Sequence, residues 1–204
     1  MTPGEAIDAF ILSLLGASPN QVEIELAQDR VREYLNDKNI GTSWTNLDKK
    51  AWCDRVIELL GAPQLFNQGH TNFCLASACL MVLFKRKPLD MADFCIALAS
   101  TGTGKIYHLK IKMTKDIQSC DIPAAAGKLP VNPTDFILIL AIQEAMGSIF
   151  SSAIKKPEDA SPAIKASNIK DILEETGYFT IKEINSDSPT LTNQTEDTDM
   201  ILVG

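Results

Sequence analysis

The chain has 204 residues, of which 45% are hydrophobic and 22% charged, enough apolar content for the core of one domain, with or without a small helical extension. Its net charge of −7, with no basic cluster longer than residues 85–87, argues against nucleic acid as a partner. No apolar run of about twenty residues occurs, and residues 1–16 lack the basic start of a signal peptide. We therefore expect no membrane span.

The cysteines and histidines limit the chemistry further. The five cysteines are an odd number without a Cys-x-x-Cys pair, so we expect no disulfide framework and a reducing, cytoplasmic compartment at synthesis. Later secretion or injection into another cell is left open. The only histidines, His70 and His108, do not have the spacing of a metal site, so we expect neither a metal nor a cofactor.

Three helices are predicted in residues 1–62, each with one apolar stripe. They cover residues 2–16, residues 24–35, and a stretch capped by residues 45–48 that ends at Gly61. Their stripes are Ala6, Phe10, Ile11, Leu14 and Leu15; then Ile24, Ala27, Val31, Tyr34 and Leu35; then Ala51, Trp52, Val56, Leu59 and Leu60. We interpret residues 1–62 as a helical N-terminal subdomain. A packing role is favoured over a partner-binding surface because each helix has a single apolar stripe.

Residues 68–84 carry the main chemical signal. A polar stretch rich in turn-forming residues, 68–73, leads to Cys74, and residues 75–84 are almost wholly apolar. This pattern predicts a loop that places Cys74 in the first turn of a buried helix. A thiol at a helix N-terminus is favoured as the thiolate, the better nucleophile. The Cys74 amide and the Gln68 side chain, six residues earlier, would be donors for a developing oxyanion.

Written as Gln-Gly-x-Thr-x-x-Cys-x-Ala, residues 68–76 resemble the nucleophile segment of papain-like cysteine peptidases, most of all their divergent bacterial branches. The resemblance covers residues 68–83. It implies a papain-like fold, attack by the Cys74 thiol on an acyl carbon, a histidine base on a later strand, and an Asn or Asp that orients this base. The alternative is that Cys74, like Cys79 and Cys95 in their apolar surroundings, is a small hydrophobic core residue.

Further elements follow in chain order. A helix is predicted from Pro88 to Leu98, a β-turn over residues 100–105, and one strand over residues 106–113. The Gly-x-Gly-Lys in the turn is not a phosphate loop because Ala99 and Ile106 stand where that motif needs Gly and Ser or Thr.

In the last part of the chain a helix is predicted to begin within residues 130–135, a polar loop covers residues 151–166, and a short helix begins at Asn168. Two strands, residues 178–184 and 200–204, flank an acidic loop. The predicted fold class is α+β and papain-like, with a mostly helical N-terminal part, a central buried helix that carries the cysteine, and a few antiparallel strands toward the C-terminus. Residues 63–204 would form the papain-like core without its final histidine-bearing strands.

The general base is the missing part of this prediction. His108 follows Cys74 by only 34 residues, whereas the histidine of the family comes much later, and it would share a solvated strand face with lysines. His108 therefore stays a secondary candidate, and His70 is interpreted as a wall of the cleft. Three alternatives remain: a base in sequence outside this chain, which we favour; replacement by an acid such as Asp199; or no catalysis. Asp197 and Asp199 would orient a missing histidine or belong to a solvated loop.

These observations lead to three functional hypotheses. The first is a papain-like cysteine protease or related thiol acyl hydrolase domain, of the kind found in bacterial effectors and toxins, acting on a peptide or protein. A second chain or a C-terminal segment would complete its fold. The second is a catalytically inactive papain-like module that binds a peptide or protein. The third is a helical interaction or chaperone-like domain whose cysteines belong to the core.

Overall fold

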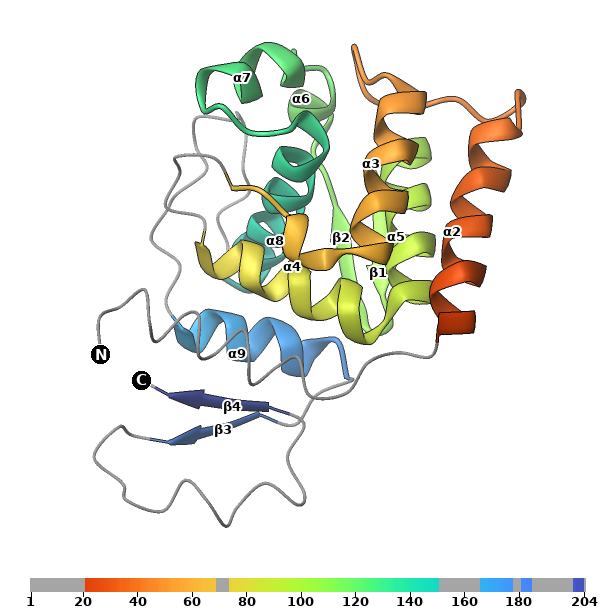
Figure 1. Cartoon of the computed structure of the whole chain (residues 1–204). Helices are drawn as coiled ribbons and strands as arrows, with labels where there is room; N and C mark the ends of the chain where they lie inside the picture. The colour runs from red at the N-terminus through yellow and green to blue at the C-terminus, as the bar shows by residue number, and fades with distance from the viewer. Residues whose placement is uncertain (1–20, 69–73, 151–165, 178–180, 185–199, 204) are drawn as a thin grey trace.

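Figure 1 shows the computed structural model, in which residues 21–68, 74–150, 166–177, 181–184 and 200–203 are described. The longer helices are α2 (Gln21–Asn36), α3 (Lys49–Gly61), α4 (Cys74–Arg86), α5 (Pro88–Thr101), α8 (Pro133–Phe150) and α9 (Ala166–Glu175). The shorter ones are η1 (Pro63–Leu65), α6 (Lys115–Gln118) and α7 (Ile122–Lys128). The strands are β1 (Thr103–Ile106), β2 (Leu109–Lys112), β3 (Ile181–Ile184) and β4 (Met200–Val203). The described chain is therefore α+β and mostly helical.

The predicted second and third helices are confirmed as α2 and α3. α2 buries Ala27, Val31 and Tyr34, as its stripe predicts. α3 begins after Asp48, whose carboxylate accepts hydrogen bonds from the backbone N–H groups of Lys50 (2.8 Å) and Ala51 (3.0 Å). One member of the predicted α3 stripe is wrong, because Ala51 is exposed. The helix predicted over residues 2–16 lies outside the described residues.

Two buried helices form the centre of the molecule. α4 runs across the front of Figure 1, with α8 behind it and α9 below. Every side chain of residues 134–145 in α8 is buried, and most of those described in α4 are buried too. A helix buried on all sides belongs inside a domain, which the apolar runs after Cys74 and Pro133 predict. The predicted start of α8 is confirmed, and the Asn132 carboxamide oxygen accepts a hydrogen bond from the Thr134 N–H (2.8 Å).

The segment after α5 differs from the prediction. α5 ends at Thr101, Gly102 adopts a left-handed conformation (φ 71°), and residues 103–106 form β1 rather than the predicted turn. β1 pairs with β2 as an antiparallel hairpin in which Ile106 is opposite Leu109. The single strand predicted over residues 106–113 is therefore wrong. Ile106 and Leu109 both face the core. In one continuous strand, two residues three positions apart would face opposite sides, so a turn must separate these two.

The C-terminal strands are also paired differently from the prediction. β3 and β4 are parallel, with Ile181 opposite Met200, and the expectation of antiparallel strands is wrong for this pair. Parallel strands cannot be joined by a tight turn and need a long connection. That connection, residues 185–199, lies outside the described residues, as do Asp197, Asp199 and residues 151–165 of the loop predicted over residues 151–166. The helix predicted from Asn168 begins earlier, at Ala166. No element is predicted from the sequence where the structure has α6 and α7.

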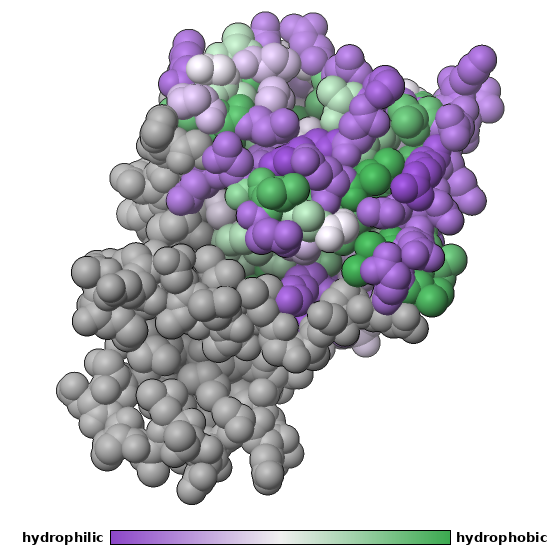
Figure 2. Space-filling model, in the orientation of Figure 1, coloured by the Kyte–Doolittle hydropathy of each residue, from purple (hydrophilic) through white to green (hydrophobic). Residues whose placement is uncertain are grey.

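One hydrophobic core connects the described helices. It includes Val31 of α2, Val56 of α3, Leu83 of α4, Phe136 of α8 and Leu173 of α9, so it extends across the boundary predicted at residue 62. The division into two domains stays a prediction. On the face shown in Figure 2, hydrophilic residues cover most of the described surface, and apolar residues form separate patches.

No single helix in the described part of the chain is long and apolar enough to cross a membrane. α7 and residues 133–145 meet that test only as a pair, and the pair is bent by 94°.

Candidate active site around Cys74

α4 begins at Cys74, and this confirms the predicted position of the helix start. The first backbone N–H groups of a helix have no partner within it and carry a partial positive charge, so a side chain at this position lies near several donors. The apolar residues that follow fix the helix inside the core. The structure describes the backbone of Cys74 but neither its side chain nor residues 69–73, so the position of the sulfur and that of His70 lie outside the described part.

A buried ion pair lies next to the segment that leads to Cys74. In α3, Arg55 binds Asp135 in the first turn of α8 through two parallel hydrogen bonds, from Nε to Oδ1 (2.9 Å) and from a terminal nitrogen to Oδ2 (2.7 Å). The Asp135 side chain is fully buried, and the Arg55 side chain is 12% exposed. The hydrogen bonds to Asp135 and Glu58 raise the pKa of the Arg55 guanidinium.

The same two side chains hold the backbone between η1 and Gln68. Arg55 donates a hydrogen bond to the carbonyl oxygen of Leu65 (2.7 Å), and Asp135 Oδ2 accepts one from the backbone N–H of Asn67 (2.8 Å). We call Arg55, Asp135 and these two backbone groups the Arg55–Asp135 clamp. It attaches the residue before Gln68 to both α3 and α8.

Gln68 directly follows Asn67, the last residue of the clamp in the sequence. Its side chain is half-buried, and its carboxamide oxygen is shielded from solvent. Gln68 is therefore held at the inner side of the segment rather than extended into water. Its role as a donor to an oxyanion at Cys74 stays a prediction.

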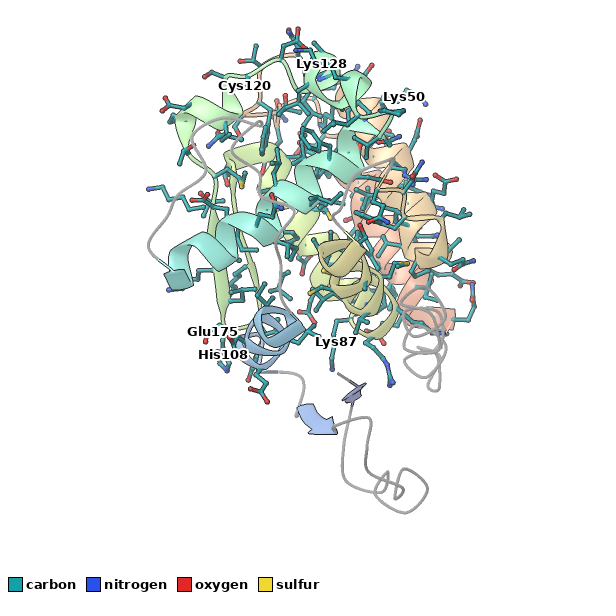
Figure 3. The ribbon with its side chains drawn as sticks, turned by 90° about the vertical axis from the view of Figure 1, so that its left-hand side faces the viewer. Lys50, Lys87, His108, Cys120, Lys128 and Glu175 are labelled. Atoms are coloured by element: carbon teal, nitrogen blue, oxygen red, sulfur yellow. The ribbon has the colours of Figure 1, made fainter. Side chains whose placement is uncertain are left out.

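The structure places His108 in the turn of the β1–β2 hairpin. Its backbone N–H donates to the Thr176 carbonyl oxygen at the end of α9 (3.4 Å), and its ring lies 3.8 Å from that of Tyr107. Figure 3 shows His108 beside Glu175, at the same end of α9. The side chain is exposed, in agreement with a solvated position, although it lies in a turn and not on the strand face shared with Lys110 and Lys112.

The hairpin turn lies toward the end of α4 that is opposite Cys74. Gly104 of β1 packs against the middle of α5, since a Cβ added to it would lie only 2.6 Å from the ring of Phe94. β1 follows the end of α5 directly, so it runs back along this helix. The turn therefore lies near the start of α5, which follows the last residue of α4 by two positions. The 13 residues of α4 span about 18 Å. The described structure does not bring His108 together with the start of α4, and its role as the base stays a prediction.

The other cysteines have different surroundings. Cys53, Cys79 and Cys95 are fully buried, which confirms the interpretation of Cys79 and Cys95 as core residues. Burial raises the pKa of Cys53 to about 11 and that of Cys79 to about 12, and it raises the pKa of Cys95 further still. Cys120 is half-buried, and its thiol donates to the Asp116 carbonyl oxygen (3.1 Å). The three buried thiols are therefore not placed to react as thiolates at neutral pH.

Comparison with known proteins gives no family for this chain. No family model matches the sequence, and neither a curated protein nor a solved structure matches the chain. The papain-like resemblance therefore depends on residues 68–83 alone.

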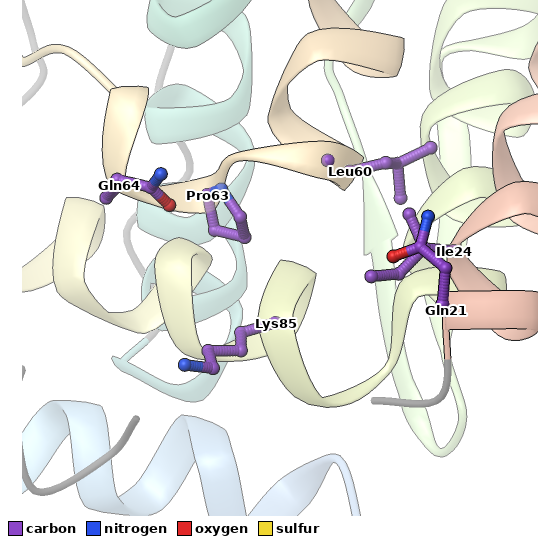
Figure 4. Close-up of a pocket in the computed structure, with 7 residues that line it drawn as sticks. Gln21, Ile24, Leu60, Pro63, Gln64 and Lys85 are labelled. Atoms are coloured by element: carbon purple, nitrogen blue, oxygen red, sulfur yellow. The ribbon is translucent and has the colours of Figure 1, made fainter. Parts of the chain in front are cut away.

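A separate cavity of about 390 Å³ lies at the other end of α4 (Figure 4). It is lined by Gln21, Ile24, Leu60, Gly61, Pro63, Gln64 and Lys85. Burial and the neighbouring Arg86 lower the pKa of Lys85. The described lining contains no cysteine, histidine or carboxylate, so it offers no nucleophile with a base. Within the described residues, no group of three His, Cys, Asp or Glu side chains is arranged to hold a metal ion.

The sequence pattern does not identify Arg55 or Asp135 as part of the site. Asp135 is predicted only as part of a helix start. One signal for it exists, since Asp135 directly precedes a long apolar run, and a carboxylate that is buried at such a position needs a partner. Its partner could not be read from the sequence, because Arg55 is 80 positions away and is one of 19 basic residues.

Proposed function

We propose that this chain is the nucleophile-bearing part of a papain-like cysteine peptidase or related thiol acyl hydrolase, with Cys74 as the nucleophile. The observation that carries the proposal is that a buried helix, α4, begins at Cys74. It is supported by the clamp, which attaches the segment before Gln68 to two other helices. A helix N-terminus favours the thiolate, and a fixed approach segment favours a defined position for the donors.

The proposed reaction proceeds in two steps. The Cys74 thiolate attacks the carbonyl carbon of a peptide or other acyl substrate, and the C–S bond forms as the carbonyl oxygen becomes an oxyanion. The Cys74 backbone N–H and the Gln68 carboxamide N–H bind this oxyanion. The leaving group departs as an amine or alcohol after it accepts a proton, and water then hydrolyses the thioester to a carboxylic acid and the free thiol.

The proton transfers require a general base, and His108 lies near the start of α5 rather than at the start of α4. We propose that a histidine in sequence outside this chain takes this role, as the resemblance implies. Without it, the reaction would lose the contribution of general base catalysis, about 10²–10⁴-fold. The chain by itself is then expected to have a reactive thiol but little turnover.

Thiol labelling tests the proposal. The native chain is treated with iodoacetamide at pH 7, and each cysteine is quantified by mass spectrometry over time. We expect Cys74 to react first, Cys120 more slowly, and the buried Cys53, Cys79 and Cys95 only after unfolding. Equal labelling of Cys74 and Cys120, or protection of Cys74 in the native chain, would contradict a nucleophilic role. A Cys120→Ser variant is the control that the fast signal comes from Cys74.

A second candidate is a catalytically inactive papain-like module that binds a peptide or protein. The observation in its favour is that His108 lies near the start of α5, which leaves the start of α4 without this histidine. This candidate predicts that Cys74→Ala leaves partner binding unchanged. It also predicts that a longer protein containing this chain has no thiol-dependent hydrolysis, whereas the first candidate predicts that it has.

A further inference from the structure

The solvent-facing side of the β1–β2 hairpin carries three positive charges. Buried and exposed residues alternate along both strands, and three of the exposed side chains are lysines: Lys105 in β1, and Lys110 and Lys112 in β2. In the antiparallel register Lys105 is directly opposite Lys110, and Lys112 is two positions further along β2 on the same side. We call these three side chains the lysine face.

The lysine face has no acidic partner in the described part of the chain. None of its three ammonium groups forms an ion pair or a hydrogen bond with a described residue, whereas Arg30 and Arg32 of α2 each bind an aspartate. Like charges directly opposite each other in a sheet are destabilising. The hairpin therefore holds positive charge that the described carboxylates do not neutralise, although the whole chain has a net charge of −7.

The backbone that carries the lysine face is fixed on its other side and at its tip. Ile106, Leu109 and Ile111 point to the opposite side of the hairpin and are buried in the core. At the tip, the His108 N–H donates to the Thr176 carbonyl oxygen at the end of α9 (3.4 Å). A partner can therefore bind the ammonium groups without the entropic cost of ordering this backbone.

We propose that the lysine face binds a short acidic segment of a partner protein in extended conformation. Successive residues on one side of a strand are about 7 Å apart, and directly opposite residues are about 5 Å apart. Carboxylates at every second position of an extended segment have the same spacing. A segment that lies along β2 therefore places one carboxylate against Lys112 and the next against Lys110 and Lys105 together. This inference does not depend on the role of Cys74.

Two observations favour a short acidic segment over a nucleic acid or a lipid surface. Three lysines match two or three carboxylates, whereas strongly salt-dependent binding of nucleic acid commonly involves about 6–10 phosphate contacts. The net charge of −7 would repel a long polyanion or an anionic membrane beyond the lysine face. A short segment can instead lie wholly within the positive field of the three ammonium groups.

Fluorescence anisotropy of a labelled peptide, titrated with the full chain, tests the proposal. The probe is a peptide in which glutamate alternates with threonine, and the same peptide with glutamine in place of glutamate is the uncharged control. The hairpin variant combines Lys105→Gln, Lys110→Gln and Lys112→Gln. All three side chains are exposed, so their replacement leaves the core intact.

A control variant lowers the net charge by the same amount elsewhere on the surface. It combines Lys38→Gln, Lys50→Gln and Lys128→Gln, at three exposed positions. Figure 3 shows Lys50 and Lys128 at the opposite end of the molecule from His108, which marks the hairpin tip. An effect of total charge would be equal in the two variants, whereas a local site is lost only in the hairpin variant.

At about 50 mM salt we expect saturable binding of the glutamate peptide and none of the glutamine peptide, and weaker binding at about 500 mM salt. Each exposed ion pair strengthens binding by a factor of up to about five, so the hairpin variant should bind about tenfold more weakly. The control variant should stay within about twofold of the unchanged chain. The hairpin variant should unfold at the same temperature as the unchanged chain or higher, because it loses the repulsion between Lys105 and Lys110.

Three results overturn the inference. Absence of saturable binding of the glutamate peptide to the folded chain would mean that the lysine face is only solvated. Equal loss of binding in the hairpin and control variants would mean that total charge alone is responsible. Tighter binding of a single-stranded oligonucleotide, or of vesicles of phosphatidylserine and phosphatidylcholine, would assign the lysine face to another class of partner.

Discussion

Replacement of Gly102 by alanine should destabilise the protein strongly, because two independent features require glycine there. Gly102 ends α5 with a positive φ of 71°, which alanine adopts at an energy of roughly 1–2 kcal/mol. An added Cβ would also lie only 2.3 Å from the Cδ and Nε2 atoms of Gln118. Gln118 is buried, and its Nε2 donates to the Met113 carbonyl oxygen (2.9 Å).

Displacement of the Gln118 side chain accounts for the larger part of the expected fall in the free energy of unfolding. When its carboxamide moves, the buried carbonyl of Met113 loses this donor, which costs about 1–3 kcal/mol. Together with the backbone term, the free energy of unfolding should fall by about 2–5 kcal/mol. Urea unfolding followed by the fluorescence of the two buried tryptophans, Trp44 and Trp52, measures this change.

A double-mutant cycle separates the two terms. In a Gln118→Ala background the obstacle is absent, so Gly102→Ala should cost only the backbone term of roughly 1–2 kcal/mol. Gly127→Ala is the matched control, because it lies in α7 with no atom within 4 Å of its added Cβ. It should stabilise the protein by about 0.5–1 kcal/mol. The reasoning is refuted if Gly102→Ala has the same effect with and without Gln118.

Three further predictions concern stability. Trp44→Phe removes one of two donors to the buried Leu98 carbonyl (2.7 Å), the other being the Gly102 N–H, and should lower the free energy of unfolding by about 0.5–1.5 kcal/mol in urea titrations. Asp48→Ala removes the cap of α3 and should cost about 1 kcal/mol in thermal or urea unfolding, whereas Asp48→Asn should be nearly neutral. Burial raises the pKa of Cys53 to about 11 and of Cys79 to about 12 from 9.0, so their stabilising effect is complete below pH 9 and is lost as pH rises toward those values. Between pH 9 and 11 each thiol should lower stability by about 1.4 kcal/mol per pH unit. A Cys79→Ala variant with an unchanged pH slope would count against this.

Elements with one apolar stripe and a local cap were predicted well. α2 and α3 follow from the spacing of Val31, Val56 and their neighbours, and the Asp48 cap marks where α3 begins. The start of α4 at Cys74 follows from a polar segment that changes abruptly to an apolar one. In each case the signal lies within a few residues, which is the range over which capping and periodicity act.

Features that depend on contacts distant in sequence were not predicted. The hairpin was missed because its turn holds Tyr107 and His108, and Tyr107 has a positive φ of 50° that is unusual for a residue with a side chain. The parallel pairing of β3 with β4 cannot be read from the sequence of two short stretches, since the pattern of apolar residues is compatible with either direction. For the candidate site, the helix start was predictable, but the clamp and the distance between His108 and Cys74 were not.

The clamp also has a consequence for the order in which the protein is built. Arg55 and Asn67 reach their shared partner, Asp135, across 80 and 68 positions of the chain. Bringing together residues so far apart in the sequence costs conformational entropy, and this cost is offset only when α8 has been made and its apolar surface can be buried. As the protein emerges from the ribosome, Cys74 is therefore synthesised long before its surroundings can form. The Arg55–Asp135 clamp can therefore form only after translation has passed α8, so an incomplete nascent chain lacks it.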